Sequence, residues 1–103
     1  MDKAKEKRLE AAGWAVDSAA DFLGLSEEEV SLVELRLRLS DSVRRRRTRL
    51  GLSQSAVAKR LGSSQSQVAK MEAADPSVSL DLLLRALLAL GVTRREIARA
   101  IAA

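Results

Sequence analysis

The fold is decided by residues 53–72, which read SQSAVAKRLGSSQSQVAKME. Val57 and Leu61 are four positions apart, as on one face of a helix, and Val68 and Met71 repeat a helical spacing further along. Two short apolar faces so close together predict two helices joined by a sharp turn. We therefore expect a helix-turn-helix.

The residues beside the two apolar faces suit helix ends. Gly62 lacks a Cβ, so it adopts positive φ at low cost where the first helix stops. Ser64 then offers a hydroxyl that accepts a hydrogen bond from the first turn of the second helix. Ser53 is placed in the same way before a first helix that we expect over residues 54–61.

The composition favours one small helical protein. The chain has 103 residues, 47% of them hydrophobic, which is enough for one modest core. The apolar residues are mainly leucine, alanine and valine, and leucine and alanine favour helices over strands. We predict an all-α fold: a compact five-helix helix-turn-helix domain over residues 26–103, with an N-terminal helical extension over residues 1–25.

Several classes of chemistry are excluded by missing residue types. The chain has no Cys, His or Tyr, which removes disulfides, thiolate and imidazole catalysis, and zinc fingers. No glycine-rich phosphate loop is present, so we expect no enzyme, no cofactor and no metal site. No long apolar run and no signal-like start occur, so we expect a soluble, cytoplasmic protein that does not enter a membrane.

Positive charge is concentrated in the middle of the chain. Residues 42–71 hold eight basic side chains and no acidic one, whereas residues 1–41 hold ten acidic and six basic side chains. Residues 72–103 hold four of each. Such a basic stretch is the electrostatic footprint of binding to a phosphate backbone. The alternative, a solvated arginine-rich helix, does not require that acidic residues vanish from the same stretch.

Helices are also predicted on both sides of residues 53–72. Ser26 and Glu29 form a capping-box pattern at the start of a helix that extends to about Leu50. Residues 34–39, ELRLRL, alternate like a strand, but no partner strand is evident, so helix is favoured. Ser79 precedes a leucine-rich helix over residues 80–90, and Thr93 precedes a last helix. The apolar residues Val92, Ile97 and Ile101 near this last helix are candidates for a dimer seam.

The second helix of the motif has a polar face that suits base reading. Val68 and Met71 must face the core, and with about 100° per residue the other side of the helix is left outward. It carries Gln65, Ser66, Ala69 and Lys70. Glutamine pairs with adenine, lysine donates to guanine, and an alanine methyl meets the thymine methyl. The alternative is that these four residues are ordinary surface residues with no role in binding.

The remaining basic side chains divide into two groups. Arg47 is four residues from Val43, which turns it toward the core, where Glu72 is a suitable partner. Removing one partner of such a buried pair costs about 3–5 kcal/mol. Other cations are candidates for phosphate contacts: Arg44, Arg45, Arg46, Arg49, Lys59 and Arg60. Gln67 points to a flank, where phosphate contact or plain solvation is expected.

The N-terminal region contains every aromatic residue of the chain. Trp14, Phe22 and Leu23 belong to a short apolar cluster that follows a highly charged start. Such a cluster is either a packing lid on its own domain or a surface that binds a partner. The sequence leaves both alternatives open.

The framework L-S-Q-x-x-x-A-x-x-L-G-x-S-x-x-x-V-x-x-M-E, followed by SLDLLLRALLALG, resembles the XRE family of lambda-repressor-like helix-turn-helix proteins. The resemblance covers residues 43–90 and implies binding to double-stranded operator DNA as a homodimer. It implies base contacts for Gln65, Ser66 and Lys70, phosphate contacts for Gln54 and its surroundings, including Ser64, and a buried Arg47–Glu72 pair. Ala74 departs from the family, which often has glycine there, and is expected to tighten or shift the following loop.

Residues 13–102 as a whole resemble the HigA-type antitoxins, in which the helix-turn-helix follows a similar lead-in. This resemblance implies a repressor that also neutralises a RelE/HigB-like ribonuclease toxin, and a partner role for Trp14, Phe22 and Leu23. Two other readings stay open: a free-standing XRE regulator without a toxin, and a protein-interaction adaptor that does not bind DNA.

Overall fold

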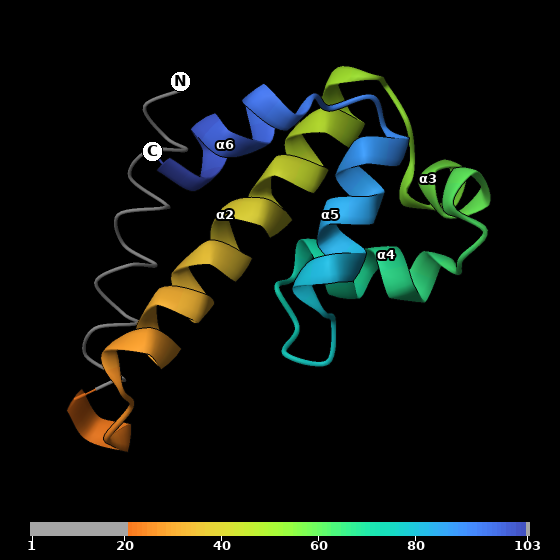
Figure 1. Ribbon diagram of the computed structural model, residues 1–103. Coiled ribbons are helices and arrows are strands. Elements are labelled where there is room, and N and C mark those ends of the chain that lie inside the picture. Colours follow the sequence, from red (N-terminus) through yellow and green to blue (C-terminus); the bar gives the residue numbers. More distant parts are fainter. Residues whose placement is uncertain (1–20, 103) are drawn as a thin grey trace. The chain divides into compact units, whose positions relative to one another are not determined.

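The computed structural model describes residues 21–102 of the chain. Its helices are α2 (Glu27–Arg49), α3 (Gln54–Leu61), α4 (Gln65–Glu72), α5 (Leu80–Ala89) and α6 (Arg94–Ala102) (Figure 1). No strand occurs in this part of the chain, and the predicted all-α fold is confirmed. The chain divides into two compact units, residues 1–38 and 39–103, and α2 contributes to both.

Helix α2 begins with the predicted capping box. The Glu29 amide donates to Ser26 Oγ, and the Ser26 amide donates to Glu29 Oε1, both at 3.2 Å. These contacts satisfy backbone groups that a helix start otherwise leaves without partners. The alternating residues 34–39 lie inside this helix, so the helical reading of ELRLRL is confirmed.

The core of residues 39–103 is built from one face of each helix. Its main cluster contains Leu39, Val43, Met71, Val78, Leu83, Ala86, Leu87 and Ile97. A smaller cluster contains Val57, Ala58, Val68 and Leu90. Ile97 is only 8% exposed, so its assignment to a dimer seam was wrong. It anchors α6 to the core, because burying its apolar surface stabilises the folded domain.

The helix ends share one hydrogen-bond pattern. After α3, the Gly62 amide donates to Lys59 O at 3.2 Å and the Ser63 amide donates to Ala58 O at 2.8 Å. This is the Schellman arrangement, which needs a left-handed residue just beyond the helix. Gly62 supplies it with φ of 62°, as predicted.

Helix α4 ends in the same arrangement with alanine in the left-handed position. The Ala74 amide donates to Met71 O at 3.3 Å and the Asp75 amide donates to Lys70 O at 3.1 Å. The φ of Ala74 is 56°, a conformation in which the Cβ crowds the following carbonyl. The loop after α4 is therefore formed at the expense of local strain, which glycine would relieve.

We predict that Ala74→Gly raises the free energy of unfolding by about 0.5–1 kcal/mol, because relief of the left-handed strain exceeds the added flexibility of the unfolded chain. Urea denaturation monitored by circular dichroism measures this change. Ala73→Gly is the matched control. Ala73 is right-handed with φ of −84°, so this variant should lose about 0.5–1 kcal/mol. A loss of stability in Ala74→Gly as well would refute the strain at this position.

Candidate nucleic-acid interface

The two helices of the motif are held in place by their caps and their packing. Ser53 Oγ accepts from the Ala56 amide at 3.0 Å, and Ser64 Oγ accepts from the Gln67 amide at 3.1 Å. Val57 of α3 and Val68 of α4 are fully buried in the same small cluster. The two serines thus start their helices as predicted, and the packing fixes α4 against α3.

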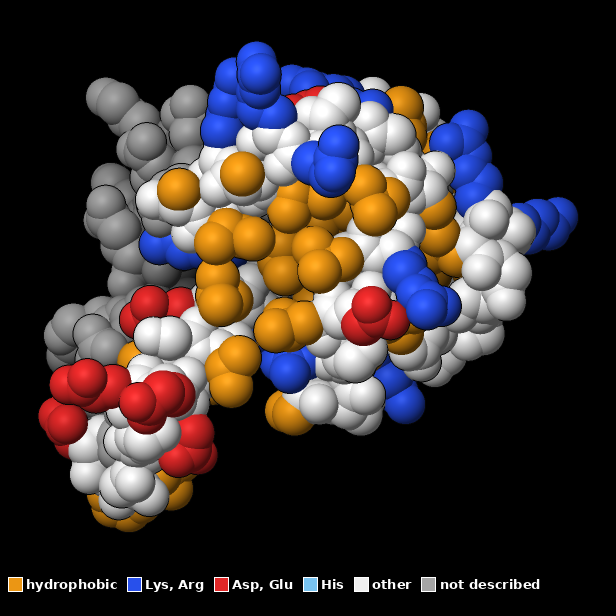
Figure 2. All heavy atoms as spheres, viewed as in Figure 1, with side chains coloured by type: hydrophobic (Ala, Val, Ile, Leu, Met, Phe, Trp, Pro, Cys, Tyr) orange, Lys and Arg blue, Asp and Glu red, His pale blue; other side chains and the backbone are white. Residues whose placement is uncertain are grey.

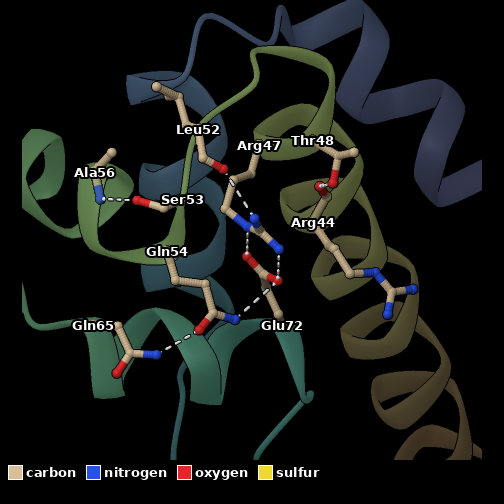
Figure 3. A network of polar contacts seen from close by, with 9 residues as sticks. All are labelled: Arg44, Arg47, Thr48, Leu52, Ser53, Gln54, Ala56, Gln65 and Glu72. Atoms are coloured by element: carbon tan, nitrogen blue, oxygen red, sulfur yellow. Dashed lines mark hydrogen bonds and ion pairs between the residues drawn. The ribbon is translucent and has the colours of Figure 1, made fainter.

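An ion pair joins α2 to α4. Arg47 Nε and Nη2 donate to the two carboxylate oxygens of Glu72 at 2.6 and 2.9 Å, and Nη1 donates to Leu52 O at 3.0 Å (Figure 3). The side chains are 20% and 6% exposed, and this bidentate geometry is the strong form of such a pair. The hydrogen bond to Glu72, more than its charge, raises the pKa of Arg47, while burial opposes the shift. The predicted structural pair is present.

Hydrogen bonds continue from this ion pair to the surface of α4. Gln54 Nε2 donates to Glu72 Oε1 at 3.3 Å, and Gln65 Nε2 donates to Gln54 Oε1 at 2.6 Å (Figure 3). Gln65 keeps its own carbonyl oxygen and one N–H for a ligand. The first residue of α4 is therefore oriented by contacts that lead back to the core.

The side chains predicted to read bases lie on the accessible side of α4. Gln65, Ser66 and Lys70 are exposed and Ala69 is half-buried, whereas Val68 and Met71 are fully buried. Their exposure meets a first requirement for direct readout, since base edges must be reached by polar groups at the surface. Gln67 is half-buried and Ser64 is exposed beside them.

Two of the predicted phosphate ligands have other partners. Arg46 Nε donates to Leu90 O at 2.9 Å, and its Nη2 donates to Gly91 O at 3.2 Å. This guanidinium binds carbonyls at the C-terminus of α5, where positive charge is favourable, so its assignment to DNA phosphates is corrected. Arg44 forms an ion pair with Asp41 at 2.8 Å. No local pattern in the sequence predicts the Arg46 contact, because its acceptors are 44 and 45 residues away.

Helical geometry separates two further arginines from α4. Arg45 and Arg49 are each two positions from Arg47, so each points about 160° away from the side chain that contacts Glu72. Both are exposed, but on the outer face of α2. The cations that remain on the motif itself are Lys59, Arg60 and Lys70.

Within residues 21–102, no three His, Cys, Asp or Glu side chains gather in a way that could hold a metal ion. None of the described helices is long and apolar enough to cross a membrane.

Comparison with known proteins places this geometry in a family. A model of helix-turn-helix domains matches residues 43–97, which is more than half of the chain. The match runs from the C-terminal part of α2 into α6 and includes the whole hydrogen-bond network. Searches among curated proteins and among solved structures returned no match. The chain therefore belongs to the helix-turn-helix family of XRE type, whose domains are sequence-specific DNA-binding regulators.

Proposed function

We propose that this protein is a transcriptional repressor that reads double-stranded operator DNA with Gln65, Ser66, Ala69 and Lys70. The observation that carries the proposal is the chain of contacts from Arg47 through Glu72 and Gln54 to Gln65. A side chain that is already oriented loses less freedom on binding, which favours a specific contact.

The chemistry of this face defines the bases that it suits. The free carbonyl oxygen and N–H of Gln65 match the donor and acceptor of adenine in the major groove, and the Lys70 ammonium suits guanine. Lys59 and Arg60 supply phosphate contacts that add affinity without sequence preference. Gln67 and Ser64 lie beside these groups, and we assign them to contacts with DNA phosphates as well.

Selection of a preferred duplex from a random pool, followed by fluorescence anisotropy, tests this function. We predict that Gln65→Ala/Lys70→Ala lowers the preference for the selected over a scrambled duplex at least 10-fold, since each lost base contact is worth about 1–3 kcal/mol. Arg85→Ala is the control, because this exposed arginine lies on α5 and pairs with Asp81. An unchanged preference in the double variant would remove these residues from base reading.

We further propose that the repressor acts as a homodimer on a two-fold operator, because one helix-turn-helix reads only a few base pairs. Apolar side chains gather over α5 (Figure 2), and Leu88 of this helix is 52% exposed. Leu84 lies one turn earlier, on the same side of the helix. Because Ile97 is buried in the core, we assign the dimer seam to Leu84 and Leu88. Ile101, another of the predicted seam residues, is exposed.

Leu88→Glu should convert the dimer to a monomer, because a carboxylate cannot be buried in an apolar seam without a partner. Sedimentation velocity measures the mass, and circular dichroism verifies that the exposed substitution leaves the fold intact. Ala89→Glu places the same charge on another side of α5 and should leave the dimer unchanged. A Leu88→Glu protein that stays dimeric would exclude this seam.

The antitoxin role is proposed from the N-terminal unit. Phe22 is 89% and Leu23 65% exposed, and exposed carboxylates of Asp21, Glu27 and Glu28 lie nearby in the sequence. Trp14, the third predicted partner residue, lies outside the described residues. An apolar pair among carboxylates suits a partner with an apolar pocket and a basic rim, and a RelE/HigB-like ribonuclease needs basic surface for its RNA substrate.

Co-expression with the product of an adjacent toxin-sized reading frame tests the antitoxin role. Phe22→Ala/Leu23→Ala should weaken the complex at least 10-fold in surface plasmon resonance, because anchors of this kind dominate interfaces, and DNA binding should be retained. Leu32→Ala, at another exposed apolar position, is the control. Absence of such a frame, or an unchanged affinity, would favour the free-standing regulator.

A further inference from the structure

A second group of basic side chains lies away from the helix-turn-helix, on the outer faces of α2 and α6. Arg45 is two positions from buried Val43, and Arg95 and Arg99 are each two positions from buried Ile97. Two positions correspond to about 200°, so these arginines point away from the core. We define the rear basic surface by its four exposed members: Arg45, Arg49, Arg95 and Arg99. Lys and Arg side chains are gathered over α6 at the upper edge of Figure 2.

The two helices adjoin one another at this surface. Arg46 of α2 donates to the carbonyls of Leu90 and Gly91, shortly before α6 begins. The backbone and hydroxyl of Thr93 lower the pKa of Glu96, and the positive charges of Arg46 and Arg49 lower it further. The C-terminal end of α2 and the start of α6 are therefore close enough for their charges to act together.

The arginines of the rear basic surface lack the partners that other arginines have. Arg44, Arg47 and Arg85 each form an ion pair, and Arg46 is bound to carbonyls. Among residues 39–102, the cations with neither an ion pair nor a side-chain hydrogen bond are the four arginines of the rear basic surface, Arg94 and, on the motif, Lys59, Arg60 and Lys70. Most of the unpaired positive charge of residues 39–102 is thus away from the recognition helix. Helix α6 contains a single acidic residue, Glu96.

We propose that the rear basic surface is a second DNA-binding surface, which contacts phosphates without sequence preference. Guanidinium groups bind phosphate oxygens in a bidentate manner, and four of them on two adjoining helices provide several contacts at once. Because the surface faces away from Arg47 and α4, it holds a DNA segment other than the bases that α4 reads. The inference rests on the proposed function in that DNA is the ligand.

The composition of the surface favours a phosphate backbone over an acidic protein. Stable protein interfaces depend on aromatic or aliphatic anchors at their centre. Beside Arg95 and Arg99, the outer side of α6 carries the small residues Ala98 and Ala102. The exposed apolar side chain of this helix, Ile101, lies on the other side. Binding to a phosphate backbone is driven by basic side chains that release counterions from the DNA, and it needs no apolar anchor.

Binding of the full chain to a random-sequence duplex of about 20 base pairs, measured over a range of salt concentrations, tests the proposal. Arg45→Gln/Arg95→Gln/Arg99→Gln should weaken binding at least 10-fold at low salt. It should also reduce the slope of log affinity against log salt by about 2–3, since each phosphate contact contributes about 0.9. Arg99→Gln alone should exceed the effect of Arg85→Gln, which removes one exposed charge elsewhere. These positions are exposed, and circular dichroism verifies folding.

The outcomes separate this proposal from the function on which it rests. A triple variant that keeps its preference for the selected duplex but loses random-duplex affinity supports both. A triple variant with unchanged affinity and slope overturns the second surface, even when Gln65→Ala/Lys70→Ala abolishes sequence preference. Equal effects of Arg99→Gln and Arg85→Gln show that net charge alone acts and also overturn it. Binding of polyglutamate that the triple variant loses, with duplex binding unchanged, assigns the surface to an acidic protein instead.

Discussion

The ion pair between Arg47 and Glu72 is the contact on which the recognition helix depends. Arg47 comes from α2, Glu72 ends α4, and the third donor of the guanidinium holds the carbonyl of Leu52 before α3. One side chain thus joins α2 to α4 and to the segment that leads into α3. Because the Glu72 carboxylate is almost fully buried, loss of its partner would leave a charge in the protein interior. Stability of the domain and orientation of Gln65 on α4 are therefore linked through the same contact.

The arginines of α2 show how a single basic run serves several purposes. Arg47 faces inward to Glu72, Arg46 binds the end of α5, and Arg44 pairs with Asp41. Only Arg45 and Arg49 are left exposed and unpaired, on the outer face. A count of positive charges along the chain overestimates the cations available to a ligand near α4, since a helix distributes neighbouring residues around its axis.

Local signals in the sequence were sufficient for most of the fold. Serine caps, the glycine after α3 and apolar residues at helical spacing depend only on neighbours, and each of the helices predicted within residues 26–103 is present. The Arg47–Glu72 pair was also predictable, because the helical face of Arg47 follows from Val43. Three features could not be predicted from the sequence: the Arg46 contact, the burial of Ile97 and the link from Gln54 to Gln65. They depend on how helices distant in sequence pack together, and no spacing within one helix encodes that.

The hydrogen bond between Gln54 and Gln65 has a consequence for how such a regulator acquires a new target. These positions lie in different helices, and Gln54 bonds Gln65 and Glu72 at once. A mutation at position 65 alone removes the donor to Gln54 Oε1 and leaves only the hydrogen bond from Gln54 to Glu72, so divergence there is expected to proceed through paired substitutions. Ser66 and Lys70 have no such tie among the described residues. Under the proposed function, these two positions are free to change one at a time, and the DNA specificity of duplicated copies should diverge there first.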